Sequence, residues 1–208
     1  MSIANKNNIF IISGPSGAGE DSIIKGLEKY FPIERIITTS TRVMRPGESQ
    51  ENPYWFITRE DFEKRRNNNE FVEWAEQYNG NLYGVTKEEI ERVKNSGRVG
   101  IWKIDWKGVI TAKKIYPVKS PPCGVGKAEF NKVNPEIPAI FVTVPNLKIL
   151  ENRIRRRGGL SEKYIRERMK YTKEWMEHAD IYDYTVVNKE GKLDEAIAQT
   201  AEIIRKHL

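Results

Sequence analysis

The sequence predicts an α/β protein in which a parallel β-sheet is flanked by helices. Short apolar runs such as Ile9–Ile12 and Pro138–Val144 are typical of strands that are buried on both faces. Amphipathic segments lie between these runs, as in Thr86–Ser96, where Thr86 can serve as N-cap and Gly97 stands just past the end. Strands that alternate with helices favour right-handed crossovers between parallel neighbours.

The elements follow one another with local signals for their starts and ends. Ile9–Ser13 is the first strand, and a Gly-rich loop leads from it into a helix from about Asp21 to Tyr30. Thr58 and Asp61 resemble a capping box that opens a helix to about Asn67. The remaining expected strands are Ile33–Thr41, Tyr54–Ile57, Phe71–Tyr78, Val99–Asp105, Pro138–Val144 and Tyr184–Asn188, and the remaining expected helices are Lys107–Tyr116, Asn146–Arg156, Glu162–Ala179 and Leu193–His207.

Residues 117–137 depart from this alternation. They are rich in Pro and Gly, show little periodicity and stand where a short loop between helix and strand is expected. We interpret them as a surface insertion without a catalytic role. Elsewhere the two histidines, His178 and His207, lie in charged helical stretches and are expected at the surface.

Composition limits the possible classes of protein. A chain of 208 residues with 38% hydrophobic residues predicts one domain with inserted lobes. No apolar run approaches the roughly 20 residues that span a bilayer, and the first residues lack the apolar region of a signal peptide. Cys123 is the only cysteine, so we expect no internal disulfide and a cytoplasmic setting. The net charge of +6 suits an anionic small substrate, and nucleic acid is unlikely because the basic residues cluster within Arg153–Arg157.

The loop after the first strand reads Gly-Pro-Ser-Gly-Ala-Gly-Glu-Asp-Ser. Gly14, Gly17 and Gly19 allow the backbone to curl with its N–H groups inward, and the next helix directs its positive end to the same point. The pattern is that of a phosphate-binding loop, G-x-x-x-x-G-K-[ST], but Glu20 stands at the Lys position and Asp21 at the Ser/Thr position. A carboxylate there would repel phosphates by several kcal/mol at an effective dielectric constant of about 20.

A series of motifs resembles the guanylate kinase family over nearly the whole chain, apart from 117–137. After the Gly-rich loop, the motifs follow in family order as Thr41-Arg42, Arg45–Glu48, Tyr54–Phe56, Asn69–Ala75, Asn81–Gly84, Ile104–Gly108, Arg153–Gly158 and Val186–Asn188.

The resemblance implies a three-layer P-loop fold with a parallel sheet flanked by helices, an inserted GMP-binding α+β lobe and a helical lid. The expected core comprises 1–33, 97–146 and 178–208, the GMP-binding lobe 34–96 and the lid 147–177. The resemblance also implies transfer of the γ-phosphate of ATP to GMP, with GDP and ADP as products and Mg²⁺ as cofactor. We expect a monomer or a homodimer, with no membrane partner.

The acceptor phosphate needs positive charge and hydrogen-bond donors. Arg42 and Arg45 lie three residues apart around a tight loop and can supply forked contacts. Tyr54 and Tyr83 can add hydroxyl donors. The resemblance assigns all four residues to the phosphate of GMP.

Guanine presents N1–H and its 2-amino group as adjacent donors, for which a carboxylate is the natural partner. The strand pleat places Glu73 opposite its apolar neighbours. The resemblance assigns Glu73 and Asp105 to this edge of the base, and Thr38 to the base oxygen. At one further position, where the family carries a hydroxyl, the chain has Val85.

Phosphoryl transfer depends on in-line placement and on neutralisation of the spreading charge. The resemblance implies catalytic roles for Arg42 and for the lid residues Arg157 and Arg168. It also implies a magnesium site at Asp21 and Ser22. The implied ATP-binding residues are Gly14, Ser16, Gly17, Ala18, Gly19, Glu20, Asp21, Ser22, Arg153 and Arg157.

Glu20 leaves three interpretations open. In the first, catalysis is lost and the chain is a GMP-binding or scaffold protein. In the second, Mg²⁺ held by Glu20 and Asp21 replaces the missing lysine. In the third, which we favour, the charges are exchanged: Lys103 stands where the family strand carries Asp. Lys103 and Asp105, two apart, would then share one strand face, and an ion pair between Glu20 and Lys103 would bring the ammonium group to the β/γ-phosphates.

Overall fold

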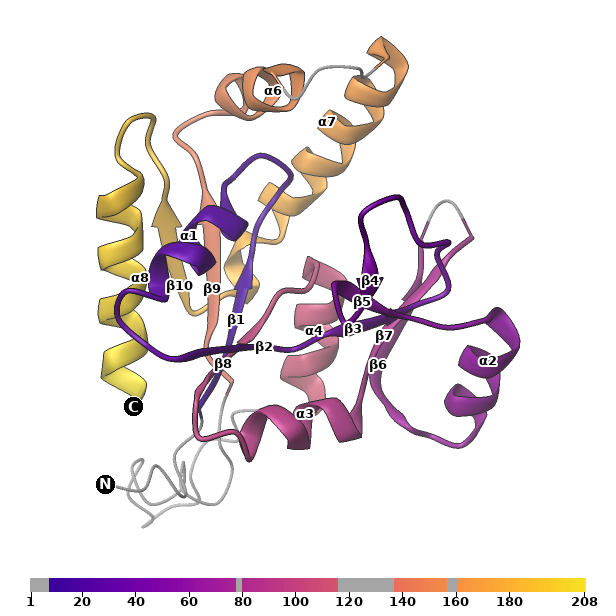
Figure 1. Cartoon of the computed structure of the whole chain (residues 1–208). Coiled ribbons are helices and arrows are strands. Elements are labelled where there is room, and N and C mark those ends of the chain that lie inside the picture. Colours follow the sequence, from indigo (N-terminus) through magenta and orange to yellow (C-terminus); the bar gives the residue numbers. More distant parts are fainter. Residues whose placement is uncertain (1–7, 78–79, 116–136, 157–160) are drawn as a thin grey trace, which may run out of the picture.

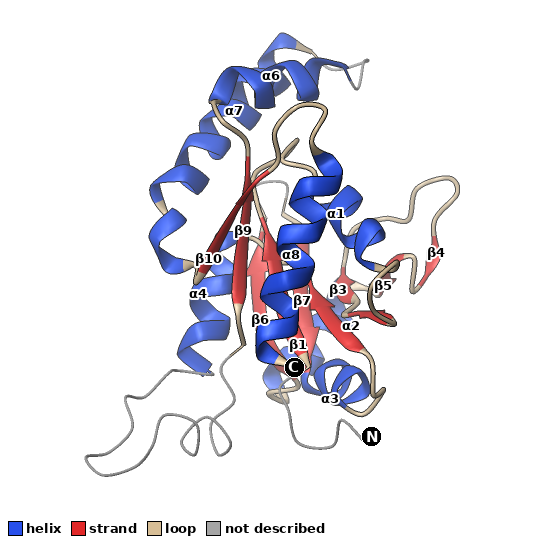
Figure 2. Ribbon diagram, turned by 90° about the vertical axis from the view of Figure 1, so that its left-hand side faces the viewer, coloured by secondary structure: helices blue, strands red, loops and turns tan. Residues whose placement is uncertain are grey.

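The computed structural model describes residues 8–77, 80–115, 137–156 and 161–208. Within these ranges the strands form two five-stranded sheets, and helices cover both faces of the first sheet (Figures 1 and 2). The predicted α/β class with a parallel sheet between helices is confirmed. No helix in the described part of the chain is long and apolar enough to cross a membrane.

The first sheet has the order β10-β9-β1-β8-β2, and every neighbouring pair is parallel. The central strand is β1, which pairs with β8 through Ile11 and Trp102 and with β9 through Ile12 and Ile140. Parallel strands end at a common edge, so the loops after β1, β8, β9 and β10 converge there. The strands are β1 (Ile9–Ser13), β2 (Ile33–Arg35), β8 (Val99–Trp102), β9 (Ala139–Thr143) and β10 (Tyr184–Val187).

Side-chain alternation along β1 divides the core into two layers. Phe10 and Ile12 join a cluster with α1 (Glu20–Leu27) and α8 (Leu193–His207), whereas Ile9 and Ile11 join the cluster on the opposite face. The helices of that second face are α3 (Lys87–Lys94), α4 (Trp106–Ile115) and α7 (Glu162–Glu177). Figure 2 shows α1 and α8 on one side of the sheet and α4 on the other.

The second sheet lies beside the first and has the order β4-β5-β3-β7-β6 (Figure 1). Its strands are β3 (Thr38–Ser40), β4 (Ser49–Gln50), β5 (Pro53–Phe56), β6 (Phe71–Glu76) and β7 (Leu82–Thr86). Helix α2 (Arg59–Asn67) packs on it through Phe62, whose ring stacks on Phe71 at 4.3 Å between centroids. Helix α6 (Leu147–Arg156) and the 3₁₀ turn η1 (Ala179–Ile181) complete the described elements.

The capping signals are confirmed. Thr58 accepts a hydrogen bond from the backbone N–H of Asp61, and Thr86 accepts one from that of Glu89. The histidine prediction is wrong. His178 is half-buried and stacks on Trp106 at 3.9 Å between ring centroids, while His207, also half-buried, shares a 2.9 Å hydrogen bond with the Tyr184 hydroxyl.

The prediction of a strand through Asp105 is also wrong, because β8 ends at Trp102. The Ser13 hydroxyl donates to the carbonyl of Ile104 at 2.6 Å. The Asp105 carboxylate then accepts from the N–H of Gly108 at 2.9 Å, in the first turn of α4. With these two contacts, the residues after Trp102 lead into α4 and do not continue the strand. Consequently the strand pleat does not decide where Lys103 and Asp105 point.

The contact of α1 with α8 gives a stability prediction. A Cβ at Gly26 would lie 2.7 Å from Cγ1 of Ile197, which is closer than packed side chains allow. We expect Gly26→Val to lower the free energy of unfolding by about 2 kcal/mol or more through overpacking. Urea denaturation measures this change. Lys25→Val is the matched control, because it places the same side chain at an exposed position of the same helix. Equal losses in the two variants would contradict the packing argument.

Candidate active site

The Gly-rich loop packs directly against the ends of β9 and β10. A Cβ at Gly14 would collide with the carbonyl oxygen of Val142, and one at Gly19 with the side-chain amide of Asn188. Gly19 also has φ 102°, which L side chains rarely adopt. The Asn188 amide donates to the carbonyl of Ala18 at 2.7 Å. The loop is therefore held by contacts that only glycine permits.

Arg153 of α6 closes the loop from the other side. Its guanidinium donates to the carbonyls of Gly17 at 3.2 Å, Ala18 at 3.3 Å and Asn188 at 3.2 Å. We predicted Arg153 as an ATP-binding residue. In this structure it holds the loop in shape through three backbone carbonyls.

Glu20, the first residue of α1, turns its side chain back onto the loop. Its Oε2 accepts a hydrogen bond from the N–H of Gly19 at 3.1 Å. Burial raises the pKa of Glu20, while the charge of Lys103 and the N–H groups of Glu20 and Gly19 act in the opposite direction. A backbone donor of the anion-binding loop is thus occupied by a carboxyl group of the chain itself.

Lys103 pairs with Asp21 and not, as predicted, with Glu20. Its ammonium lies 2.7 Å from Oδ2 of Asp21, and Arg35 approaches Oδ1 of the same carboxylate at 3.7 Å. The lysine reaches the start of α1 because β8 has already ended at Trp102. The Lys103 side chain is 44% exposed and that of Asp21 67% exposed, so the pair is accessible to solvent.

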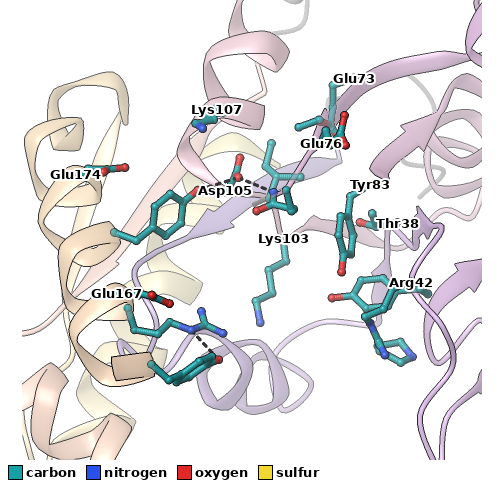
Figure 3. Close-up of a pocket in the computed structure, with 18 of the residues that line it drawn as sticks. Thr38, Arg42, Glu73, Glu76, Tyr83, Lys103, Asp105, Lys107, Glu167 and Glu174 are labelled. Carbon is teal, nitrogen blue, oxygen red and sulfur yellow. Dashed lines mark hydrogen bonds between the residues drawn. The ribbon is translucent and has the colours of Figure 1, made fainter. Parts of the chain in front are cut away.

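A cavity of about 1020 Å³ opens between the two sheets and α7 (Figure 3). All seven predicted acceptor residues line it, among them the predicted catalytic residue Arg42, together with two further predicted catalytic residues. These residues are Thr38, Arg42, Arg45, Tyr54, Glu73, Tyr83 and Asp105, with Lys103 and Arg168. The acceptor set is therefore brought together in space from six separate stretches of sequence.

One end of the cavity carries the arginines and tyrosines. The Arg42 guanidinium donates to Glu48 at 2.8 Å and lies over the Tyr54 ring at 5.3 Å from its centroid. Tyr54 and Tyr83 meet edge to face at 5.6 Å. Glu48 also accepts from the N–H of Arg45 at 2.7 Å, so it organises both arginines. Sequence reasoning placed Glu48 in a motif but gave it no role.

The other end carries several carboxyl groups, among them Glu73 and Asp105. Glu73 is only 9% exposed, and burial, with a smaller contribution from the charge of Asp105, raises its pKa to about 8. Asp105 accepts hydrogen bonds from Tyr171 at 3.2 Å and Gln77 at 3.4 Å, in addition to Gly108. Tyr171 and Gln77 also line the cavity, and the sequence signals singled out neither of them.

Helix α7 supplies a further predicted cation, Arg168. Nε of Arg168 donates to the hydroxyl of Tyr164 at 2.9 Å, one turn earlier in the same helix, and both side chains line the cavity. Arg157, the other predicted catalytic arginine of the lid, lies outside the described residues. So does the insertion, apart from Ile137 at its end.

A Gly-rich loop at the carboxyl edge of a parallel sheet, beside a cavity with cations at one end and carboxyl groups at the other, defines a P-loop nucleotide-binding protein. The guanylate kinase family model matches residues 6–119 and 126–207. A guanylate kinase of Rickettsia felis is 36% identical over 98% of this chain and 96% of its own length. One of Idiomarina loihiensis is 35% identical over 87% of this chain and 79% of its own length.

The fold agrees with that of a solved relative. The crystal structure of guanylate kinase from Anaplasma phagocytophilum covers 99% of this chain and 88% of its own, with a TM-score of 0.66 at 24% identity. The chain belongs to the guanylate kinase family, and is therefore a kinase.

The raised pKa of Glu73 gives a prediction about GMP binding. With a pKa of about 8, Glu73 is mostly protonated at pH 7 in the free protein, whereas a guanine that donates two hydrogen bonds favours the ionised form. Binding should release a proton, so GMP affinity should rise up to about tenfold per pH unit below 8 and level off above it.

Calorimetry between pH 7 and 9, in buffers of different ionisation enthalpy, measures both the affinity and the released proton. The range begins at pH 7 because the second pKa of a phosphate monoester lies near 6. An affinity that does not change across this range would contradict the assignment of Glu73.

Proposed function

We propose that the protein transfers the γ-phosphoryl group of ATP to GMP, and that Lys103 supplies the positive charge missing from the phosphate-binding loop. One observation supports the proposed role of Lys103. Lys103 lines the acceptor cavity, and its ammonium contacts Asp21 at the start of the loop helix, 2.7 Å away. This supports a cation at the boundary between the two proposed nucleotide sites, where the transferred phosphoryl group would pass.

Lysine suits this position because its charge is compact and its stem is flexible. Rotation about the side-chain bonds can carry the ammonium from Asp21 to the phosphates without moving the backbone. Two carboxyl groups, Glu20 and Asp21, then remain beside the donor phosphates, and their repulsion must be offset. The positive end of α1 contributes to that, as does Arg35, which already lies near Asp21.

The acceptor residues divide between the two ends of GMP. Arg42, Arg45, Tyr54 and Tyr83 would hold the phosphate, while Glu73, Asp105 and Thr38 would bind guanine. Adenine lacks the adjacent N1–H and 2-amino donors that a carboxylate recognises. The acceptor phosphate is already anionic, so the reaction needs no strong general base. Arg42, Arg168 and Arg157 would neutralise the charge that spreads during transfer.

The chemistry of the loop fits Mg²⁺. Asp21 and Ser22 offer a carboxylate and a hydroxyl at the exposed start of α1, and Mg²⁺ typically binds one or two carboxylates together with substrate phosphates. Within the described ranges, no group of three or more His, Cys, Asp or Glu side chains is arranged to hold a metal. The proposed ion would enter with ATP and, when bound, neutralise phosphate charge. Asp21 would hold it after release from Lys103.

Catalysis is favoured over the alternative of a GMP-binding or scaffold protein because the acceptor cavity keeps all seven of its predicted residues. Helix α7 also presents Arg168 to the same cavity. A cytoplasmic location, expected from the lone cysteine, and a monomeric or homodimeric state both stay predictions.

Removal of the proposed cation is the direct test. We expect Lys103→Met to lower kcat by about 100-fold or more, the loss typical of removing a group that stabilises transition-state charge. ADP release with ATP, GMP and Mg²⁺ in a coupled assay measures it. Lys25→Met, on the exposed face of the same loop helix, is the control and should keep the wild-type rate. An unchanged rate in Lys103→Met would exclude the role of Lys103, and a wild type that binds GMP without turnover would exclude the activity.

Exchanging the charges of Glu20 and Lys103 tests whether a single positive charge, placed at either position, supports turnover. We expect Lys103→Asp to abolish most turnover, and Glu20→Lys added to it to recover at least about tenfold, because the pair restores the usual loop lysine. Glu20→Gln in the same background is the control, since it removes the repulsion without supplying a cation. Equal recovery in both double variants would mean that only the repulsion of Glu20 matters.

A further inference from the structure

Asp105 is held by donors from three different elements of the fold. Gly108 donates from the first turn of α4 to Oδ1, Tyr171 from α7 to Oδ2, and Gln77 from the end of β6 to Oδ2. The distances are 2.9, 3.2 and 3.4 Å. Figure 3 shows Asp105 at the cavity wall, with the Lys103 side chain extending away from it. The carboxylate is thus fixed in orientation from the core, the second sheet and α7 together.

The acceptor positions of the Asp105 carboxylate that the protein leaves open are available to a ligand. A carboxylate offers about four acceptor positions, and protein donors fill three of those on Asp105. Guanine presents three hydrogens on this edge, one on N1 and two on the 2-amino group. A bidentate contact with Glu73 accounts for two of them. One amino hydrogen and one acceptor position of Asp105 are left.

Tyr171 is suited to hold the Asp105 carboxylate in this orientation. Burial, together with the charge of Asp105, raises the pKa of Tyr171, so the phenol keeps its proton and remains the donor. Its ring packs edge to face on Trp175 at 6.4 Å, and Trp175 belongs to the buried cluster under α4. The hydroxyl is therefore anchored to the core through its own ring.

We propose that Tyr171 is a positioning residue for guanine specificity: it orients the Asp105 carboxylate so that the last acceptor position meets the 2-amino group of the acceptor base. The inference rests on the proposed function, because it takes GMP as the acceptor. It assigns to Asp105, as set by Tyr171, the part of the discrimination against hypoxanthine, which lacks the amino group, that comes from the second amino hydrogen. Glu73 meets N1–H in either base and the first amino hydrogen only in guanine.

The test compares the binding of GMP and IMP by calorimetry in the wild type and in Tyr171→Phe. We expect the Kd for GMP to rise about five- to tenfold, because the misoriented Asp105 makes a weaker charge-assisted hydrogen bond, and that for IMP to change less than about twofold. The preference for GMP over IMP should fall accordingly. Tyr184→Phe is the matched control, because it removes a hydroxyl that bonds His207 outside the cavity. It should leave the preference unchanged.

A GMP/IMP preference that Tyr171→Phe leaves unchanged would overturn the inference. So would an equal weakening of both ligands, which a merely structural role predicts. Binding does not depend on turnover, so a wild type that binds GMP but releases no ADP would contradict the proposed catalysis and leave this test intact. A wild type that does not bind GMP would overturn both.

Discussion

The close approach of the Gly-rich loop to the ends of β9 and β10 is the constraint on which the rest of the site depends. Gly14 lies against the Val142 carbonyl and Gly19 against the Asn188 amide, at distances that no side chain tolerates. With Asn188 and Arg153 bonded to the loop carbonyls, the curl of the backbone is fixed from outside. The start of α1 is fixed with it, and this is why Asp21 lies within reach of a residue that leaves the neighbouring strand β8.

Charge around the loop is balanced within the chain. A usual loop of this type presents backbone donors and a lysine to a phosphate. Here the N–H of Gly19 is engaged by Glu20, and Lys103, the proposed substitute for that lysine, is engaged by Asp21. These two groups, both proposed to bind the donor, thus each have a carboxyl partner within the chain. Binding of the donor must replace these contacts, and the exchange is feasible because the Lys103 pair is exposed, where an ion pair contributes little net stability.

Local chemistry explains which features the sequence could predict. The caps at Thr58 and Thr86 depend on neighbours three residues away, and the acceptor residues lie in contiguous motifs. The partner of Lys103 depends instead on where β8 ends, and that end is set by Ser13, which bonds the Ile104 carbonyl across 91 residues of sequence. Tyr171 was missed for a similar reason, because a tyrosine on an amphipathic helix reads as a core residue until its hydroxyl is seen to reach Asp105.

The short segment after β8 therefore reaches both the loop helix and the acceptor cavity. Lys103 points to the loop helix, and Asp105 lines the acceptor cavity, with one residue between them. Ile104 is pinned through its carbonyl by Ser13, and Asp105 caps α4, so the backbone on which both side chains stand is held at two successive residues. Any movement of the Lys103 ammonium toward the phosphates must then arise from rotation of the side chain. In the proposed function, donor binding would therefore recruit the cation without disturbing the Asp105 carboxylate.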